Sequence, residues 1–394
     1  MALCTVGHIA TVRGHTGRVS VLCWLGDSEV LVTGSYDGTA QVWSLGQAGA
    51  LAVLRHDGVV RCLDWSGDLL ATGSYGGDCV VWTGGGQRVT SLAGHTDIRA
   101  VRFSGSGRLL VTAGADTCRV WREEEEGSWT CRQVLRGGGR VVWRGEQEFL
   151  TGGGSGTIQH WRVGQDTAVQ TLGGHTGPVH SLAWQPDTDV LASGGQDTTV
   201  RLWRLGCAQP GVEPPLRGHE GCVWEVAWGP GTAGSPAILA SWDSSPGLRL
   251  WTGAGDCLHV LPCTTDGLIT SNSGNISFSP GGLLACRGSE VAVWRARSGQ
   301  LEARLGVPGG RVCWGAGGSR LAVVTQEEED QWQVVSVFDT EELGTLRSLR
   351  TITLRAMAFY LRDRVGRNQE DLQNVLDKQG VPRSLHRELQ LYLG

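Results

Sequence analysis

A histidine, a serine or threonine and an aspartate occur together in several segments of the chain. His175, Ser193 and Asp197 form the clearest of these sets. In hydrolases such a set activates the hydroxyl as a nucleophile. Here the set recurs along the chain, and each copy is followed by a tryptophan at the end of a short apolar run. That recurrence favours a structural role for these residues over catalysis.

Other residues that could carry out chemistry also favour structural roles. The acidic runs at residues 123–126 and 327–330 could serve acid–base work or bind a divalent cation, but flanking glycines favour solvated loops. The glycine run near Gly152 lacks the lysine and the helix that a phosphate cradle needs. The 12 cysteines include no CxxC pair, and most lie in apolar runs, as small buried residues of a reducing compartment would. We therefore expect no enzyme, no cofactor and no metal site.

Tryptophan organises the chain. It recurs about every forty residues, each time closing an apolar run, at Trp43, Trp82, Trp121, Trp161, Trp203, Trp251 and Trp294. A repeat of this length predicts a β-propeller with one four-stranded blade per repeat. The 394 residues include 61 glycines, which fall in turns between the apolar runs. The sequence thus predicts an all-β fold in which each blade covers its neighbours.

Eight units can be counted. The first is residues 14–43, and the clearest copy is residues 174–203. The last, residues 311–339, keeps the strand pattern but replaces the closing tryptophan with Phe338. We predict eight blades, because an unpaired half-blade would leave open strand edges. The residues before Gly14 could complete the last blade by lending it an outer strand.

These units resemble the WD-repeat family over residues 8–342. In that family a His, a Ser or Thr, an Asp and a Trp form a buried hydrogen-bonded tetrad, which stabilises a blade only when every member is satisfied. The resemblance assigns three complete tetrads: His15, Thr33, Asp37 and Trp43; His95, Thr112, Asp116 and Trp121; His175, Ser193, Asp197 and Trp203.

Other blades depart from the family pattern. Gly76, Ser155 and Ser245 stand where blades 2, 4 and 6 should carry the aspartate. Blades 4, 7 and 8 lack the Gly-His pair altogether. We expect these blades to be held more by packing than by the tetrad, and to be looser.

A propeller exposes its loops on one face around the central channel, and binding residues collect on such loops. In the family, the loops that enter the blades share that face with the turns between the second and third strands. Aromatic residues and arginine are the usual anchors of protein interfaces. The predicted partner-binding residues are Arg18, Tyr36, Tyr75, Gln196 and Trp242.

The segment 343–394, called the tail below, differs from the repeats. Tryptophan and glycine become rare, and a three-to-four spacing of apolar residues predicts an amphipathic helix. The tail resembles the SOCS box of WD-repeat and SOCS-box proteins, although Ala358 or Thr353 stands in place of its usual cysteine. The resemblance implies contacts with elongin B/C and a cullin through Leu349, Ile352, Leu354, Met357, Leu361, Pro382 and Leu385.

The net charge of −5 and the lack of a basic stripe argue against nucleic acid as a ligand. No apolar run is long enough to cross a membrane, and the first residues do not resemble a signal peptide. We therefore expect a cytoplasmic protein, or one that is also nuclear. The sequence favours a non-catalytic interaction platform, the substrate-recognition subunit of a cullin-RING ubiquitin ligase of the elongin B/C type. The alternative is a scaffold of another assembly whose tail docks or self-associates.

Overall fold

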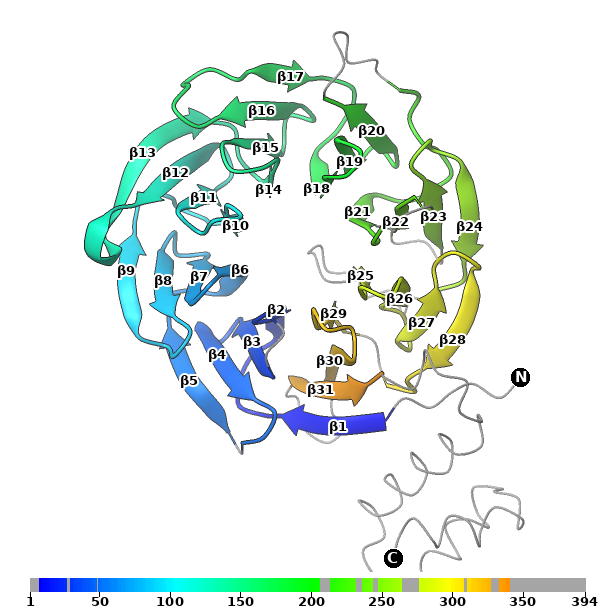
Figure 1. Ribbon diagram of the computed structural model, residues 1–394, viewed down its shortest axis with the longest axis horizontal. Coiled ribbons are helices and arrows are strands. Elements are labelled where there is room, and N and C mark those ends of the chain that lie inside the picture. The colour runs from blue at the N-terminus through cyan, green and yellow to red at the C-terminus, as the bar shows by residue number, and fades with distance from the viewer. Residues whose placement is uncertain are drawn as a thin grey trace, which may run out of the picture.

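The computed structural model describes residues 7–26, 29–47, 49–205, 213–231, 236–243, 247–263, 276–307, 310–326 and 333–340. Short runs rich in valine, leucine and tryptophan form strands, since their β-branched and aromatic side chains suit a pleated surface. Glycine-containing turns separate them. Figure 1 shows the strands arranged as eight sheets around a central channel. The prediction of an eight-bladed β-propeller is confirmed.

The first four blades each contain four antiparallel strands that run in chain order from the channel to the rim (Figure 1). Blade 1 contains β2 (Val19–Trp24), β3 (Val30–Ser35), β4 (Thr39–Ser44) and β5 (Ala50–Arg55); blade 2 contains β6 (Val60–Ser66), β7 (Leu69–Ser74), β8 (Cys79–Thr83) and β9 (Arg88–Leu92). Blade 3 contains β10 (Ala100–Phe103), β11 (Leu109–Ala113), β12 (Thr117–Glu123) and β13 (Trp129–Arg136), with the one-turn helix η1 (Glu125–Gly127) in the first acidic run; blade 4 contains β14 (Arg140–Trp143), β15 (Glu148–Gly152), β16 (Ile158–Arg162) and β17 (Gln170–Leu172).

Blades 6 and 7 repeat the same pattern, whereas blade 5 has three strands among its described residues. Blade 5 contains β18 (Val179–Gln185), β19 (Val190–Gly195) and β20 (Val200–Arg204); blade 6 contains β21 (Val223–Trp228), β22 (Ile238–Asp243), β23 (Leu248–Thr252) and β24 (Cys257–Leu261); blade 7 contains β25 (Ile276–Phe278), β26 (Leu283–Cys286), β27 (Ala292–Arg295) and β28 (Gln300–Arg304).

The outer edge of blade 5 is covered by an irregular segment. Leu216 forms an isolated bridge with Val200 of β20. Glu213 pairs with Arg204 at 2.6 Å, so this segment runs beside β20. Pro214 and Pro215 lie between these two contacts and have no N–H to donate. Within the described residues, the prolines explain why the segment around Leu216 forms a single bridge rather than a fourth strand.

Blade 8 joins the two ends of the described chain. It contains β29 (Val312–Trp314), β30 (Arg320–Gln326) and β31 (Gln333–Asp339), and its outer strand is β1 (Gly7–Val12). β1 pairs antiparallel with β31, from Gly7 opposite Asp339 to Val12 opposite Val335. The expectation that residues before Gly14 lend the last blade its outer strand is therefore correct. This pairing closes the ring and leaves β31 with a partner on each side.

The hydrophobic core is a series of clusters between neighbouring blades. One cluster joins Trp43 and Val19 of blade 1 to Ala322 and Val335 of blade 8, and thus seals the ring where its ends meet. Six further clusters repeat this arrangement between successive blades, from blades 1 and 2 to blades 6 and 7, and another joins blades 7 and 8. Each sheet face is apolar because it packs on a neighbour.

Tryptophans of the inner strands link blades by a second contact. The indole of Trp24 donates to the carbonyl of Cys313 at 3.1 Å, and that of Trp143 donates to the carbonyl of Arg102 at 2.9 Å. The indole of Trp228 donates to the carbonyl of Ala183 at 3.2 Å. In each case the acceptor lies on the inner strand of the preceding blade. These three residues were not singled out from the sequence.

Removing β1 should open the ring. A chain lacking residues 1–12 should lose about 3 kcal/mol or more of unfolding free energy, because β31 gains an unpaired edge and Val12 no longer covers the cluster between blades 8 and 1. Urea unfolding followed by tryptophan fluorescence would measure the loss. A chain lacking only residues 1–6 is the control. Equal stability of the two truncated chains would contradict closure by β1.

Candidate interaction face and its supporting tetrads

The tetrad of blade 1 connects an entry loop, two strands and a turn. The indole N–H of Trp43 donates to Thr33 Oγ1 at 2.9 Å, and His15 Nε2 lies 2.7 Å from the same oxygen. His15 Nδ1 lies 2.8 Å from Asp37 Oδ2. Burial lowers the pKa of His15, against the opposing effect of Asp37, so the ring is neutral at pH 7. A carboxylate can only accept, which places the proton on Nδ1, and the Thr33 hydroxyl then donates to Nε2.

Asp37 also ties the entry loop to the turn. Its carboxylate accepts from the backbone N–H of Thr16 at 2.9 Å and from that of Thr39 at 2.8 Å. Burial opposes its charge, but hydrogen bonds from Thr39 and His15 outweigh that penalty and hold the pKa of Asp37 below its ordinary value. Gly38 follows with φ of 79°, a conformation that favours glycine. The tetrad thereby fixes the shape of the turn that carries Tyr36.

Blade 5 has the same arrangement. His175 Nδ1 lies 2.9 Å from Asp197 Oδ1, and His175 Nε2 lies 2.8 Å from Ser193 Oγ. Trp203 donates to that hydroxyl at 2.9 Å. Asp197 accepts from the N–H of Thr176 at 3.0 Å, as Asp37 does from Thr16. The structure brings together all eight residues assigned to blades 1 and 5.

Blade 3 corrects the sequence assignment. His95 Nε2 lies 2.9 Å from Thr112 Oγ1, and Trp121 donates to the same oxygen at 2.9 Å. The described hydrogen bonds of the His95 ring reach Thr112 and Thr117, and none reaches Asp116. The hydroxyl and the tryptophan are nine residues apart here instead of ten. Because the segment is one residue shorter, Asp116 directly precedes β12 and lies out of reach of the His95 ring.

Blade 6 has an aspartate in its tetrad that the sequence assignment did not include. His219 Nε2 lies 2.6 Å from Ser241 Oγ, and Trp251 donates to Ser241 at 2.8 Å. The acid is Asp243, whose Oδ2 lies 3.1 Å from His219 Nδ1, and not the turn position given to Ser245, which lies outside the described residues. Asp243 is the last residue of β22, two positions after the serine, and it accepts from the N–H groups of the entry loop. A search restricted to the turn misses it.

Blades 2 and 4 keep part of the tetrad. Trp82 donates to Thr72 at 2.7 Å, and His56 Nε2 lies 2.8 Å from that oxygen. Gly76 supplies no carboxylate, so His56 Nδ1 has no hydrogen-bond partner within the described chain. In blade 4, Trp161 donates to Thr151 at 2.9 Å. The indole-to-hydroxyl bond thus persists where the histidine or the aspartate is missing.

Tyr36 and Tyr75 lie at equivalent turns of neighbouring blades. The N–H of Tyr36 donates to the carbonyl of Arg18 at 2.8 Å, and that of Tyr75 donates to the carbonyl of Val59 at 2.8 Å. Each turn therefore adjoins its own entry loop on one face of the ring. Tyr36 is 44 % exposed and Tyr75 is 54 % exposed. We call this pair of tyrosines the tyrosine face.

Arginines support both tyrosines. The guanidinium carbon of Arg61 lies 4.5 Å from the ring centroid of Tyr75, and that of Arg18 lies 6.0 Å from the centroid of Tyr36. Both fall within the range of cation–π attraction. Arg61 also lies 3.5 Å from Asp97. These contacts restrict the aromatic rings before any partner binds.

Of the other predicted face residues, Gln196 is exposed and Trp242 is not. The backbone N–H of Gln196 donates to Pro178, so its turn also lies beside an entry loop. Trp242 is 1 % exposed, which corrects its assignment to the partner-binding face. β22 continues through Asp243, so Trp242 is still in a strand and packs between blades 6 and 7. The equivalent position in blade 1 is Gly34, where even a Cβ would meet Val60 at 2.7 Å.

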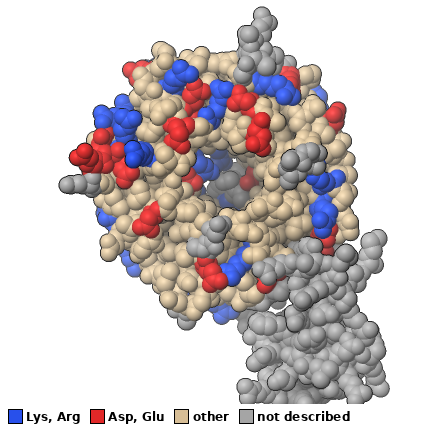
Figure 2. Space-filling view, viewed as in Figure 1, with Lys and Arg blue, Asp and Glu red and all other residues tan. Residues whose placement is uncertain are grey.

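A buried arginine lies just before the inner strand of blade 8. Arg311 precedes β29 and is 7 % exposed, and its pKa falls to about 10. Burial is the main cause, and Arg18 and Arg287 add to it, while Glu225 opposes it. Figure 2 shows acidic and basic groups interspersed over the viewed face, with uncharged surface between them. The viewed face therefore carries no large field of one sign.

The family model described as "WD domain, G-beta repeat" matches residues 7–44, 50–83, 86–122 and 166–204. These matches include blades 1, 2, 3 and 5, which carry the histidine, the hydroxyl and the tryptophan described above. The chain is a WD40-repeat β-propeller. Solved structures share this fold: the C-terminal WD40 domain of Sif2 covers 86 % of the chain with a TM-score of 0.67 at 19 % identity. A computationally designed protein, Ika8, has the same TM-score at 22 % identity.

Curated relatives are similar over part of the WD40 propeller. Identity is 31 % with the probable cytosolic iron-sulfur protein assembly protein 1 of Neurospora crassa, over 62 % of this chain and 53 % of that protein. It is 27 % with the protein transport protein sec13 of Emericella nidulans, over 62 % and 79 %. It is 30 % with the mouse F-box-like/WD repeat-containing protein TBL1X, over 56 % and 38 %. The matches thus span about half of the first relative and less of the third.

The tail lies outside the described residues, and with it Leu349, Ile352, Leu354, Met357, Leu361, Pro382 and Leu385. The domain boundary placed at residue 343 lies there too. In the described part of the WD40 propeller, no three His, Cys, Asp or Glu side chains gather as metal ligands would. Nor is any described helix long and apolar enough to cross a membrane.

Two aspartates of the WD40 propeller should differ in their effect on stability. Asp197→Ala should cost roughly 1–3 kcal/mol of unfolding free energy, because it removes the main acceptor of the buried His175 N–H and leaves only the long contact with Thr199 Oγ1 at 3.4 Å. Asp116→Ala should stay within about 0.5 kcal/mol, because its carboxylate bonds no tetrad residue. Ser155→Ala, which removes only an exposed contact with Thr157, should also be mild. Equal costs for Asp197→Ala and Asp116→Ala in urea unfolding would contradict the assignment.

The neutral histidines should make the WD40 propeller sensitive to acid. Burial lowers the pKa of His56 to about 4, whereas an unfolded chain titrates near 6.5. Between these values the unfolded state binds the extra proton, so stability falls as the pH falls from about 6.5 to about 4, by up to roughly 3 kcal/mol for this group. Urea unfolding at pH 7 and pH 4.5 would measure the loss. His56→Gln should show a smaller difference, and an unchanged difference would count against this cause.

Proposed function

We propose that this WD40 propeller is a non-catalytic scaffold that binds a partner protein through the tyrosine face. The observation that carries the proposal is the pair of exposed tyrosines on neighbouring blades, each beside an arginine, on turns that adjoin their own entry loops. Tyrosine and arginine anchor protein interfaces more often than other surface residues do. Rings that are already restricted lose little freedom on binding.

Replacing both tyrosines should remove partners selectively. The test is affinity purification from cells with quantitative mass spectrometry. The recovered amount of each face-dependent partner should fall at least tenfold with Tyr36→Ala/Tyr75→Ala, since a hot-spot residue contributes about 2 kcal/mol or more. Leu51→Ala/Val53→Ala is the control, because both residues are exposed on the outer strand β5. The thermal midpoint of both variants should stay near that of the wild type. Identical partner sets for the two variants would place the binding site elsewhere.

The finer proposal is a substrate-recognition subunit of an elongin B/C-type cullin-RING ubiquitin ligase. Its support is the spacing of apolar residues in the tail and their resemblance to a SOCS box. A helix of this kind buries its i, i+3 and i+4 residues in a partner's groove. The names of the relatives point to iron-sulfur protein assembly, protein transport and an F-box-like protein, so the shared propeller does not select one assembly. The alternative is a scaffold whose tail docks on another protein or on a second copy.

Binding of purified elongin B/C to the full chain tests the finer proposal. The intact chain should bind, and Leu354→Asp/Leu361→Asp should abolish binding, since burying each leucine stabilises the complex by roughly 1.5–3 kcal/mol. The melting of the propeller should not change. Gln369→Asp/Gln373→Asp, which alters polar residues of the tail, is the control. Failure of the intact chain to bind would favour the scaffold alternative, and loss of propeller stability in the leucine variant would make the helix a structural brace.

A further inference from the structure

A cysteine occupies the hydroxyl position of blade 7. In blade 1, Trp43 lies opposite Leu31, and the tetrad residue Thr33 is two positions further along β3. In blade 7, Trp294 lies opposite Leu284, and the residue two positions further along β26 is Cys286. The indole N–H of Trp294 has no hydrogen-bond partner within the described chain. Blade 7 thus lacks the bond that six other blades share.

A second cysteine occupies the histidine position of the same blade. In blade 1, Leu54 lies opposite Ala40, three residues before the tryptophan, and His56 follows two residues later. In blade 6, Leu261 lies opposite Leu248, again three residues before the tryptophan, and Cys263 follows two residues later. Cys263 therefore enters blade 7 as His56 enters blade 2.

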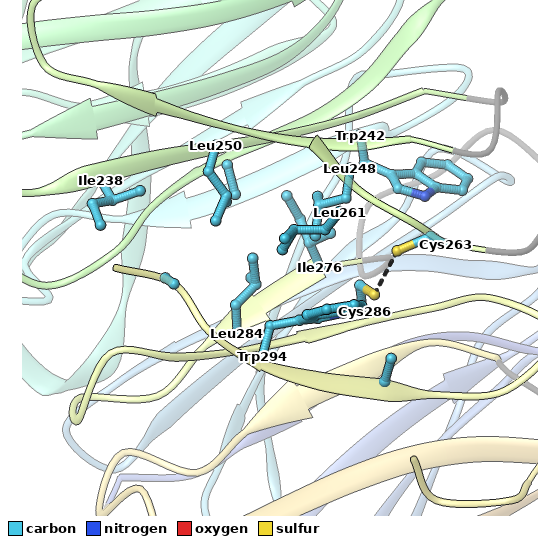
Figure 3. Packing of buried hydrophobic residues seen from close by; sticks show 13 residues of the cluster. Ile238, Trp242, Leu248, Leu250, Leu261, Cys263, Ile276, Leu284, Cys286 and Trp294 are labelled. Atoms are coloured by element: carbon cyan, nitrogen blue, oxygen red, sulfur yellow. Dashed lines mark hydrogen bonds between the residues drawn. The ribbon is translucent and has the colours of Figure 1, made fainter. Parts of the chain in front are cut away.

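The two sulfurs are in contact. Cys263 Sγ and Cys286 Sγ lie 2.8 Å apart, as Figure 3 shows, in the cluster between blades 6 and 7. Their residues are 2 % and 0 % exposed and 23 positions apart in the chain. His56 Nε2 makes the equivalent contact with Thr72 Oγ1 at 2.8 Å. A pair of thiols thus replaces a histidine and a hydroxyl at the same place in the repeat.

We propose that Cys263 and Cys286 are an oxidative modification site, at which a peroxide converts the two thiols into an intramolecular disulfide. A thiolate of one cysteine attacks a peroxide oxygen, which breaks the O–O bond, releases hydroxide and leaves a sulfenic acid. The second sulfur then attacks the sulfenic sulfur, forms the S–S bond and expels water. Two thiols and one hydrogen peroxide give one disulfide and two waters, and the two cysteines supply both electrons.

The packing makes this site slow to react but selective. The hydrogen bond from Cys286 and burial both raise the pKa of the Cys263 thiol, so little thiolate exists while blade 7 is closed. Oxidation therefore follows an opening of the blade. Once formed, the bond joins the entry segment of blade 7 to its second strand, as the His–hydroxyl contact does in other blades. Among the described cysteines, Cys131 and Cys257 are exposed, and no sulfur–sulfur contact joins them.

The full-length protein should be treated with hydrogen peroxide and digested without reduction. Mass spectrometry should find a linked peptide that joins Cys263 to Cys286, with a loss of two hydrogens. The thermal midpoint of the oxidised protein should rise by a few degrees, since a disulfide limits the unfolded chain, and dithiothreitol should reverse the rise. Cys286→Ser should remain folded, because a serine at this position gives Trp294 a hydroxyl acceptor, and it should show neither the link nor the rise.

Cys118→Ala is the matched control, since Cys118 is wholly buried in a strand and has no neighbouring thiol. It should keep both the link and the rise. Oxidation of Cys131 and Cys257 without any link between Cys263 and Cys286 would overturn the proposal. So would a rise of the same size in Cys286→Ser, or in Cys263→Ser if the first variant does not fold.

Discussion

The hydrogen bond from a third-strand tryptophan to a second-strand hydroxyl is the constraint on which the blades depend. It measures 2.7 to 2.9 Å in blades 1 to 6, whatever else those blades have lost. It holds a large buried ring in one orientation and satisfies its only polar atom. With the ring fixed, each sheet of blades 1 to 6 presents a similar apolar surface to its neighbour. The histidine and the aspartate are additions to this bond, which explains why blades 2 and 4 tolerate their absence.

The fold could be predicted from the sequence because the information is periodic. Seven recurring tryptophans, with an apolar run before each, and an eighth unit that keeps the strand pattern but ends in Phe338 specify the blades without any knowledge of long-range contacts. Closure by the residues before Gly14 could be anticipated since the last unit needs an outer strand. The boundaries between blades were predictable for the same reason, because the sequence pattern that ends each repeat is local.

The tetrads and the face were less predictable, because one residue of register decides them. A one-residue deletion moves Asp116 away from His95. In blade 6 the acid is Asp243, the last residue of β22 rather than a residue of the turn, and the residue before it, Trp242, is buried. The indole bonds of Trp24 and Trp143 depend on how neighbouring blades sit, which no local pattern records. The contact of Cys263 with Cys286 becomes recognisable only when the strand pairings are known.

On the tyrosine face, the turn of Tyr36 is shaped by a complete tetrad, whereas the turn of Tyr75 has Gly76 in place of the aspartate. Asp37 accepts from an entry loop and from the turn that follows Tyr36, so the buried network sets the spacing of exposed side chains. The same logic explains how relatives with different names can share one ring. Residues at the turns can change without disturbing the bonds beneath them.

The pairing of β1 with β31 has a consequence for biosynthesis. β1 leaves the ribosome long before its partner β31, so the ring stays open until almost the whole propeller has been made. At ordinary rates of translation this interval lasts on the order of tens of seconds. During it, blade 1 exposes the apolar face that later meets blade 8, and β1 carries an unpaired edge. A nascent chain of this design is a natural client for chaperones that shield apolar surface until the final blade emerges.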